Sequence, residues 1–448
     1  MKITRRIAEL ICDSQFSDFS PQVVDYSKNL ALSALGAMIA GSFRTSGQLF
    51  TKYVRRVGGN PEATVMGSGF KTAVETAAMA NATFAHATEY EDDSFPEAVS
   101  SYTIFPAVFA LGEKMKLSGK DILESFVVGY EVQARIALAC PEARRRGITN
   151  LCLAGTLGCA AAAAKLLKLD VERTTMALSL AASQCSGIAH QTGTNAHTFE
   201  MGVASRNGLT AAMLACEGFT GQPDIFEAPR GLFEIINGGK IPQSEDIINK
   251  WGNPFRIMDI GIKQYPCCYH LQRIIEAALI LKHEFKLSAG DIDEVNVEVN
   301  LFLPQVVQYP DPRNEDEAQF SLPHAVAAAL LEEKILPGSF GHDKIHERSF
   351  KEMRKKVRTI VREDWGWGTV GWSPVITIVL KSGKKLVREQ AHAKGQPPDL
   401  LRFEDVIEKY KTCVEPVLAN QHIKQSVKMI LELQDVRDIS EIIEEVAF

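Results

Sequence analysis

Several features that mark common protein classes are missing from this 448-residue sequence. It contains no block of five or more lysines and arginines, and its formal net charge is −6, so we expect no nucleic-acid partner. The longest uncharged apolar stretch, residues 151–164, falls short of the roughly 18 residues that suggest a membrane span. We therefore expect a buried core helix at this stretch and no membrane partner.

The sequence also lacks the short motifs of well-known active sites. It has no P-loop, no G-x-G-x-x-G after a strand, no G-x-S-x-G elbow and no H-E-x-x-H pair. None of its nine cysteines belongs to a C-x-x-C pair, so a zinc or iron–sulfur site has little support. We expect no metal and no other cofactor.

The cysteine count and the N-terminal segment indicate the same cellular compartment. Residues 1–15 have the pattern of an amphipathic helix rather than that of a signal peptide with a long apolar core. An odd number of thiols without a secretion signal favours reduced cysteines, so we expect a cytoplasmic protein. We interpret the neighbouring Cys267 and Cys268 as packing residues and the basic run Arg144–Arg146 as a solvated helix end.

The composition is that of a globular protein, with 46% apolar and 23% charged residues, and the length predicts two domains. Up to about residue 260 the chain reads as a succession of helices, in which small residues favour close packing of neighbouring backbones. The predicted helices include 74–90, 119–139, 156–167 and 198–217.

The pattern changes after Pro266. Residues 293–300 alternate apolar and polar side chains, which predicts a half-buried strand, and residues 375–389 predict a hairpin that turns at Ser382-Gly383. Two helices are expected between them, at 323–334 and about 343–363. Helices return after Leu401, so the fold class is mostly α, with a large helical domain interrupted by a smaller α+β insertion. The expected boundaries are 1–262 for the first part of the helical domain, 263–395 for the insertion and 396–448 for the helices that complete it.

Three segments concentrate side chains that carry chemistry. The first, His86 to Ser94, ends an alanine-rich helix with four carboxylates in five residues. If the helix continued to Asp93, then His86, Tyr90 and Asp93 would share one face, and crowded carboxylates would raise one another's pKa into the range of a general acid or base. The alternative is a solvated acidic helix end before a loop at Pro96.

The second segment, residues 187–208, holds His190, His197 and Arg206 around a glycine-rich loop and the start of a helix. A helix N-terminus attracts a carboxylate, although a capping or core histidine is the alternative. The third segment holds Lys263, Tyr265 and His270 at the predicted domain junction, where clefts commonly bind small ligands. An ordinary connector is the alternative there.

In their order along the chain, these segments resemble the MmgE/PrpD family. The resemblance covers nearly the whole chain and rests on the stretches ATEYEDD, FPAVFALGEKMKLSGKDILESFVVGYEVQARI, GTLGCAAAAAKLLKLD, GVASRNGLTAAMLACEGFTG, KQYPCCYHLQRIIEAA and FSLPHAVAAALLEEKI. It implies a helical domain with an α+β lid, a homodimer, no metal or flavin, and a small acidic substrate in the cleft between the domains.

The resemblance also locates the family's site residues and shows where this chain departs from them. The acidic motif falls on Glu91 to Ser94, and Lys263, Pro266 and His270 fit one branch of the family. Where the family has a histidine after the acidic motif, this chain has Val99 or Ser100. Three further family positions also differ. A family histidine is replaced here by Thr149, and a family lysine is replaced by His197. A histidine of the decarboxylase branch is replaced by Gln272.

These residues lead to three hypotheses. The first is a cofactor-independent lyase, a dehydratase or decarboxylase that removes a proton next to a carboxylate of a small di- or tricarboxylate. The second is an epimerase that uses the same proton abstraction, and the third is an inactive member that binds a carboxylate. The catalytic candidates are Asp92, His197, Lys263 and His270. The substrate-binding candidates are His86, Glu91, Asp93, Thr149, His190, Arg206, Tyr265 and Gln272.

Overall fold

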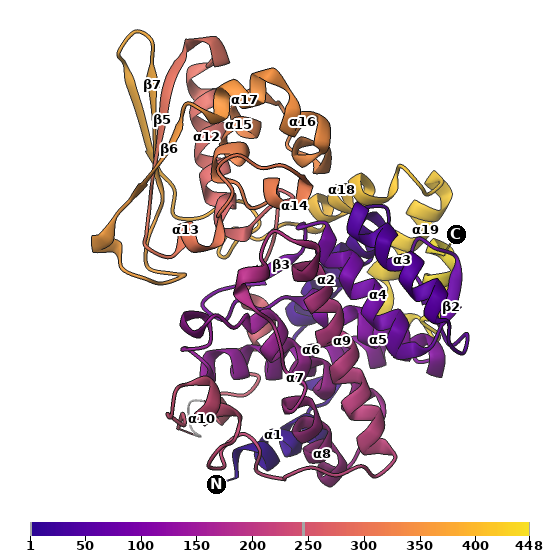
Figure 1. The fold of residues 1–448 in the computed structure, drawn as a ribbon. Helices are drawn as coiled ribbons and strands as arrows, with labels where there is room; N and C mark the ends of the chain where they lie inside the picture. The colour runs from indigo at the N-terminus through magenta and orange to yellow at the C-terminus, as the bar shows by residue number, and fades with distance from the viewer. Residues whose placement is uncertain (1, 244–246, 448) are drawn as a thin grey trace.

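The computed structural model describes residues 2–243 and 247–447, and the fold is mostly α-helical, as the sequence predicts. Buried apolar side chains form two clusters. The first draws its residues from 3–262 and again from 401–446, and the second from 265–386. In Figure 1 the first cluster corresponds to the helical body and the second to the part that carries the larger sheet.

The helices of the body pack closely because small residues lie where they cross. A Cβ atom added to Gly208 would lie 2.4 Å from the carbonyl oxygen of Thr156, and one added to Gly202 would lie 2.5 Å from that of Met79. Glycine therefore allows these backbones to touch. The helices are α1 (Ile3–Asp13), α2 (Pro21–Ser42), α3 (Thr45–Val57), α4 (Val74–Ala87), α5 (Phe105–Met115), α6 (Gly119–Ala139), α7 (Asn150–Leu166), α8 (Val171–Ala182), α9 (Asn195–Cys216) and α10 (Leu232–Ile236).

The second cluster lies between a four-stranded sheet and the helices that cover one face of it (Figure 1). The strand order is β6-β5-β7-β8, with β5 parallel to β6 and the other pairs antiparallel. The strands are β5 (Ile292–Val299), β6 (Val357–Val361), β7 (Val375–Leu380) and β8 (Lys385–Glu389). The helices of this part are α12 (Gln272–Phe285), α13 (Leu303–Val306), α14 (Glu315–Ala318), α15 (Leu322–Leu331), α16 (His342–His346) and α17 (Arg348–Arg354).

The predicted strand at 293–300 and the hairpin at 375–389 are confirmed as β5 and as β7 with β8. The predicted helix at 343–363 is wrong in its second half. It is split into α16 and α17, and residues 357–361 form β6 instead. The β-branched run VRTIV pairs along its whole length with β5, and this non-local pairing outweighs the helical character of the charged residues before it.

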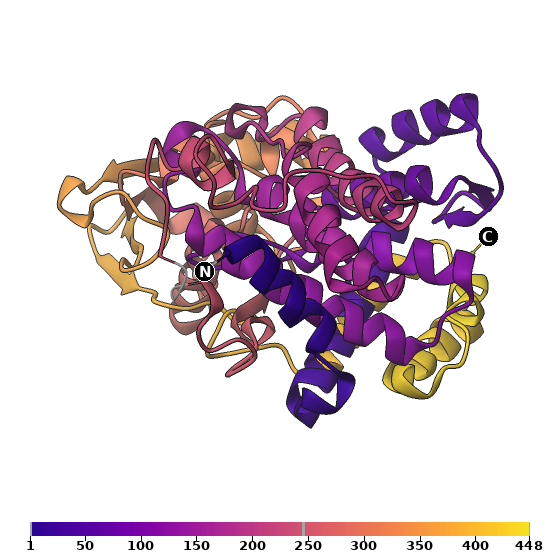
Figure 2. The same cartoon turned by 90° about the horizontal axis from the view of Figure 1, so that it is seen from below.

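The C-terminal helices return to the body, as Figure 2 shows from below, where they lie beside its N-terminal helices. They are α18 (Phe403–Val414), α19 (Asn420–Leu431) and α20 (Ser440–Val446). Tyr410 on α18 packs on α2 so tightly that a Cβ at Gly36 would lie 2.9 Å from its ring. Movement of the sheet part as a lid stays a prediction.

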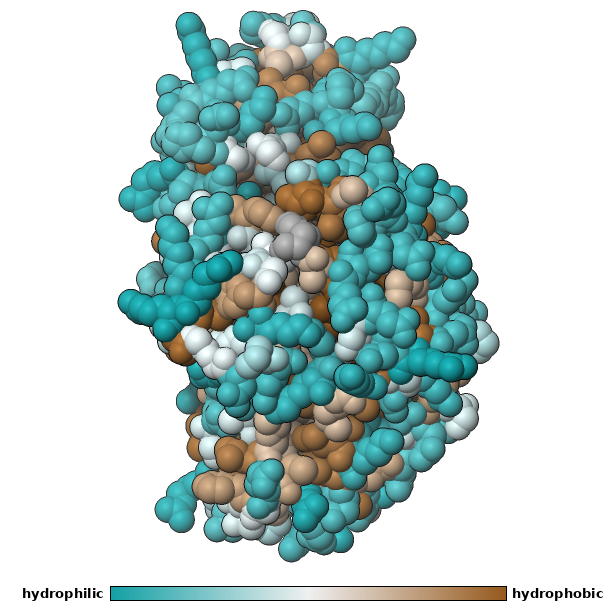
Figure 3. Space-filling view, turned by 90° about the vertical axis from the view of Figure 1, so that its right-hand side faces the viewer, coloured by the Kyte–Doolittle hydropathy of each residue, from teal (hydrophilic) through white to brown (hydrophobic). Residues whose placement is uncertain are grey.

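Figure 3 shows that hydrophilic side chains cover most of the face on the right of Figure 1, with hydrophobic ones in separate groups. Within residues 2–243 and 247–447, no helix combines the length and apolar character needed to cross a bilayer. The homodimer stays a prediction.

Candidate active site

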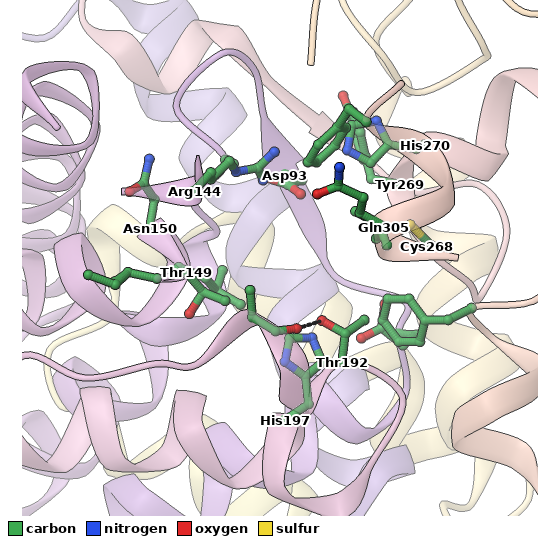
Figure 4. Close-up of a pocket in the computed structure, with 18 of the residues that line it drawn as sticks. Asp93, Arg144, Thr149, Asn150, Thr192, His197, Cys268, Tyr269, His270 and Gln305 are labelled. Carbon is green, nitrogen blue, oxygen red and sulfur yellow. Dashed lines mark hydrogen bonds between the residues drawn. The ribbon is translucent and has the colours of Figure 1, made fainter. Parts of the chain in front are cut away.

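A cavity of about 440 Å³ lies where the body meets the sheet part. Its walls come from the end of α4, the segment before α7, the loop before α9 and the junction before α12. Figure 4 shows side chains from these segments converging on it. The structure places nine of the twelve predicted site residues in its lining: His86, Glu91, Asp92, Asp93, Thr149, His190, His197, Lys263 and His270.

Arg206, Tyr265 and Gln272 lie away from the cavity in the described part of the chain. The guanidinium of Arg206 donates to Oδ1 of Asn207, and the hydroxyl of Tyr265 donates to Oε2 of Glu276 at 2.7 Å. Gln272 is fully buried and holds the junction loop through its side-chain amide. Its Oε1 accepts from the backbone N–H groups of residues 264 and 265, and its Nε2 donates to the carbonyls of residues 265 and 267.

The acidic segment is not the helix end that the sequence suggests. Helix α4 ends at Ala87, and Glu89 has a φ of 47°, in the left-handed region that a non-glycine residue rarely adopts. The chain then enters strand β3 (Asp92–Ser94), which pairs antiparallel with β4 (Ile260–Ile262). The idea that His86, Tyr90 and Asp93 share one helix face is therefore wrong. The β3–β4 pairing brings the acidic segment beside Lys263 instead.

Lys263 is 2% exposed and lies between two glutamates. Its Nζ donates to Oε2 of Glu89 at 2.9 Å, to the Glu89 carbonyl at 3.3 Å and to Oε1 of Glu91 at 2.5 Å. Burial alone lowers the pKa of this ammonium group, but the charges of Glu89 and Glu91 outweigh that effect and raise it. Lys263 therefore stays charged, and these three bonds occupy its three N–H donors.

His86 and His197 meet edge to face, with ring centroids 4.6 Å apart. His197 lies in the first turn of α9, as predicted, and Nε2 of His86 is 3.4 Å from Oε1 of Glu89. Burial, reinforced by His197, lowers the pKa of His86 to about 3, so this ring is neutral. One ligand atom each from His86, Glu89 and His197 lie within 4.8 Å of one another, so these three residues could hold a metal ion.

Asp92 and Asp93 have different surroundings. Oδ1 of Asp92 accepts from the hydroxyl of Ser100 at 3.0 Å and the N–H of Ser101 at 2.7 Å, and Oδ2 accepts from the hydroxyl of Ser101. Burial raises the pKa of Asp92 to about 6 against these bonds. Burial also raises the pKa of Asp93, while Arg144 and Lys263 oppose the shift. Asp92 thus holds the backbone turn, and Asp93 lies beside a cation (Figure 4).

Arg144 is the most informative lining residue that the sequence did not single out. The interpretation of Arg144–Arg146 as a solvated helix end is wrong for Arg144, which lines the cavity, whereas Arg146 is exposed. The Arg144 guanidinium lies 5.3 Å from the ring centre of Phe95 and 5.2 Å from that of Phe302. Burial lowers its pKa, and Asp93 opposes this. Its Nη1 is buried and has no hydrogen-bond partner among the described residues.

His270 contacts the same two aromatic rings as Arg144. His270 lies 4.6 Å from Phe95 and 5.1 Å from Phe302, and burial together with Arg144 lowers its pKa, so the ring is neutral. Cys267 and Cys268 are buried free thiols, in keeping with a packing role, although Cys268 also reaches the lining. Other lining residues that sequence reasoning missed are Glu89, Arg145, Asn150, Thr192, Tyr269, Gln305, Gln308, Phe320 and Trp367.

Apart from Gln272, which holds the junction loop, the positions where this chain departs from the family pattern fall in two places. Val99 and Ser100 are fully buried behind the cavity, where Ser100 donates to Asp92. Thr149 and His197 line the cavity at or near the starts of α7 and α9. The first pair therefore supports the turn, while the second pair faces the site.

Comparisons with known proteins agree with this architecture. The model of the MmgE/PrpD N-terminal domain matches residues 5–245, and that of the MmgE/PrpD C-terminal domain matches residues 265–434. Similar proteins include the cis-aconitate decarboxylases of Mus musculus (25% identical; 98% of this chain and 92% of that one) and Homo sapiens (26%; 98% and 93%). A third is the cis-aconitate decarboxylase of Aspergillus terreus, 24% identical over 99% of this chain and 95% of that one. The chain belongs to the MmgE/PrpD family.

Proposed function

We propose that this chain is a lyase that forms a carbanion next to a carboxylate of a small acid, either by removing a proton and then expelling water, or by losing carbon dioxide and then taking up a proton. The observation that carries the proposal is the juxtaposition of Asp93 and Arg144 in the cavity, a carboxyl group of raised pKa beside a guanidinium with a free N–H. Family membership and the names of the similar decarboxylases support the same reaction class.

The proposed roles follow from charge and hydrogen bonding. Arg144 binds a substrate carboxylate through Nη1, because a charge-assisted bond to a guanidinium suits that group. Asp93 takes the proton, since its raised pKa brings it closer to that of the working solution. In dehydration, protonated Asp93 then gives this proton to the leaving hydroxyl group, and in decarboxylation it gives a proton to the carbanion; neutral His270 stands on the same side and can donate a hydrogen bond through its ring N–H. Each of these three roles is assigned to a side chain that lines the cavity.

Two catalytic assignments made from the sequence change in this proposal. Asp92 supports the turn, because Ser100 and Ser101 occupy both of its oxygens. Lys263 becomes a positioning residue that holds Glu89 and Glu91 in place, because its N–H donors are already used by these two residues.

An epimerase is the second candidate, favoured by one observation. Asp93 and His197 are both titratable, and Figure 4 places them on different sides of the cavity. Epimerisation requires one group to remove a proton from one face of a carbon and another to return it to the opposite face. The lyase remains the first candidate because the curated relatives carry a decarboxylase name.

Incubation of the enzyme with di- and tricarboxylates in deuterated buffer tests the proposal. A lyase yields an unsaturated or decarboxylated product, and Asp93→Asn should remove that product while Asp92→Asn leaves residual turnover with lower stability. Recovery of inverted, deuterated substrate without elimination would identify the epimerase. Binding without exchange or product across the panel would instead support a carboxylate-binding protein and overturn the proposal.

A further inference from the structure

One end of the cavity holds a buried excess of negative charge. Glu89 and Glu91 share the single ammonium group of Lys263, which bonds to one oxygen of each carboxylate. Oε1 of Glu89 and Oε2 of Glu91 are buried and lack a hydrogen-bond partner in residues 2–243 and 247–447. Among Glu89, Glu91 and Lys263, two carboxylates and one ammonium leave one excess negative charge, which is costly in a buried site; the nearby Lys409 donates instead to the carbonyls of Tyr90 and Lys263.

The histidines at this end add further unpaired groups. Both ring nitrogens of His86 and Nδ1 of His197 are buried without a hydrogen-bond partner in the part of the chain that the structure describes. His86 is 1% exposed, and its ring lies against His197 and near Glu89. Neutral imidazole has one acceptor nitrogen, so this end offers the two carboxylate oxygens and two ring nitrogens as acceptors. We call Glu89, Glu91, His86 and His197 the acceptor end.

The other end of the cavity has the opposite character. Nη1 of Arg144 is buried and has no hydrogen-bond partner among the described residues. A guanidinium can only donate hydrogen bonds. Figure 4 shows Arg144 and His197 on opposite sides of the labelled group. A ligand that satisfies both ends must therefore accept at one end and donate at the other.

We propose that the substrate is a small carboxylate that also carries an ammonium group, bound with the carboxylate on Arg144 and the ammonium at the acceptor end. This inference deepens the proposed function and rests on it for the identity of the site. An ammonium group has three N–H donors, which can satisfy three of the four unpaired acceptors, and one positive charge, which balances the single charge left by Glu89, Glu91 and Lys263.

A divalent metal ion is the competing occupant, because His86, Glu89 and His197 are suitable ligands. The charge balance favours ammonium. A metal ion would turn the excess of one negative charge into an excess of one positive charge beside Lys263, whose Nζ is 2.9 Å from the other oxygen of Glu89.

Calorimetric titration of the full chain with paired ligands tests the inference. Alanine against propionate and aspartate against succinate differ within each pair only by the amine. We expect each amine to bind at least about tenfold more tightly than its partner, which is about 1.4 kcal/mol. Glu91→Gln removes the charge excess while keeping the shape, so it should abolish that preference. The matched control is Glu276→Gln, since Glu276 bonds to Tyr265 outside the cavity; it should keep the preference.

Three results would overturn the inference. They are equal or tighter binding of propionate and succinate, an unchanged preference in Glu91→Gln, and stoichiometric uptake of Zn²⁺ or Mn²⁺ that His197→Gln removes. Thermal unfolding of each variant shows whether it is folded. Binding is measured without turnover, so amine selectivity without any product would refute the lyase alone. Turnover of plain carboxylates without amine selectivity would refute this inference alone.

Discussion

Replacement of Arg144 by glutamine tests the proposed anchoring of the substrate carboxylate. The change removes a guanidinium whose buried Nη1 has no partner within the described ranges, together with the positive charge beside Asp93. A hydrogen bond to a charged group contributes about 1.5–3 kcal/mol, and about 1.36 kcal/mol corresponds to tenfold in rate. We therefore expect kcat/KM to fall about 13-fold to 160-fold.

The same variant has a second, independent readout. Arg144 opposes the rise that burial causes in the pKa of Asp93, so its removal raises that pKa further. Asp93 must be deprotonated to act as a base, and the low-pH limb of the kcat/KM profile should therefore move to higher pH. A loss of stability alone would lower activity without moving this limb.

Steady-state kinetics from pH 5 to 9 on the best substrate of the panel measure both effects. Arg146→Gln is the matched control, because Arg146 is exposed and does not belong to the cavity lining within the described residues. It should change kcat/KM less than about twofold, as exposed substitutions generally do. A fall of less than about threefold in Arg144→Gln, or a low-pH limb that does not move, would refute the proposed role.

Three further predictions concern the groups that build the site. Lys263→Met should lower the free energy of unfolding by about 3–5 kcal/mol, because it leaves Glu89 and Glu91 buried without a counter-charge; an unchanged urea midpoint would contradict this. Gln272→Ala should cost about 2–4 kcal/mol through the lost bonds to the junction loop. A large rise in KM at unchanged stability would restore its predicted substrate-binding role. Burial lowers the pKa of Lys409 to about 7, whereas a lysine of the unfolded chain titrates near 10.4. As the pH falls between these two values, the unfolded chain binds a proton that the folded protein does not, so the free energy of unfolding decreases. Stability should therefore rise more from pH 7 to 10 in the wild type than in Lys409→Met, and equal slopes in urea denaturation would exclude this effect.

Local composition was sufficient to predict most of the helices. The alanine-rich and small-residue stretches that became α4, α7 and α9 have high helix propensity and pack through residues close together in sequence. Strand β6 could not be predicted in this way. Its partner β5 lies about 60 residues earlier, and a parallel pairing of this kind leaves little local pattern in a charged context.

The site shows the same limit at the level of single side chains. The motif at Glu91 to Ser94 indicated an acidic site, but it could not show that Asp92 bonds to Ser100 and Ser101 while Asp93 lies beside Arg144. Neighbouring residues of a strand point to opposite sides, so the difference depends on where α4 ends and β3 begins. Because α4 ends at Ala87, Asp92 and Asp93 lie on a strand and not on the helix that the sequence predicts.

Arg144 illustrates why the remaining residues were missed. Its sequence neighbours are two more arginines, and such a run is usually solvated. A short 3-10 turn over Arg144–Arg146, closed by Gly147 at φ 80°, directs the first of them inward and leaves the third exposed. The only sequence signal for this was the glycine directly after the run.

The sequence by itself determined the mostly helical class, the family and the segments that hold the site, because these depend on composition, periodicity and the order of motifs. The tertiary structure decided which side chains of those segments face the cavity and which are held by other bonds. Pairing of β3 with β4 brings Lys263 between two glutamates, and the turn before α7 brings Arg144 beside Asp93. Such contacts join residues far apart in sequence, and their charges set one another's pKa only once the fold has buried them together.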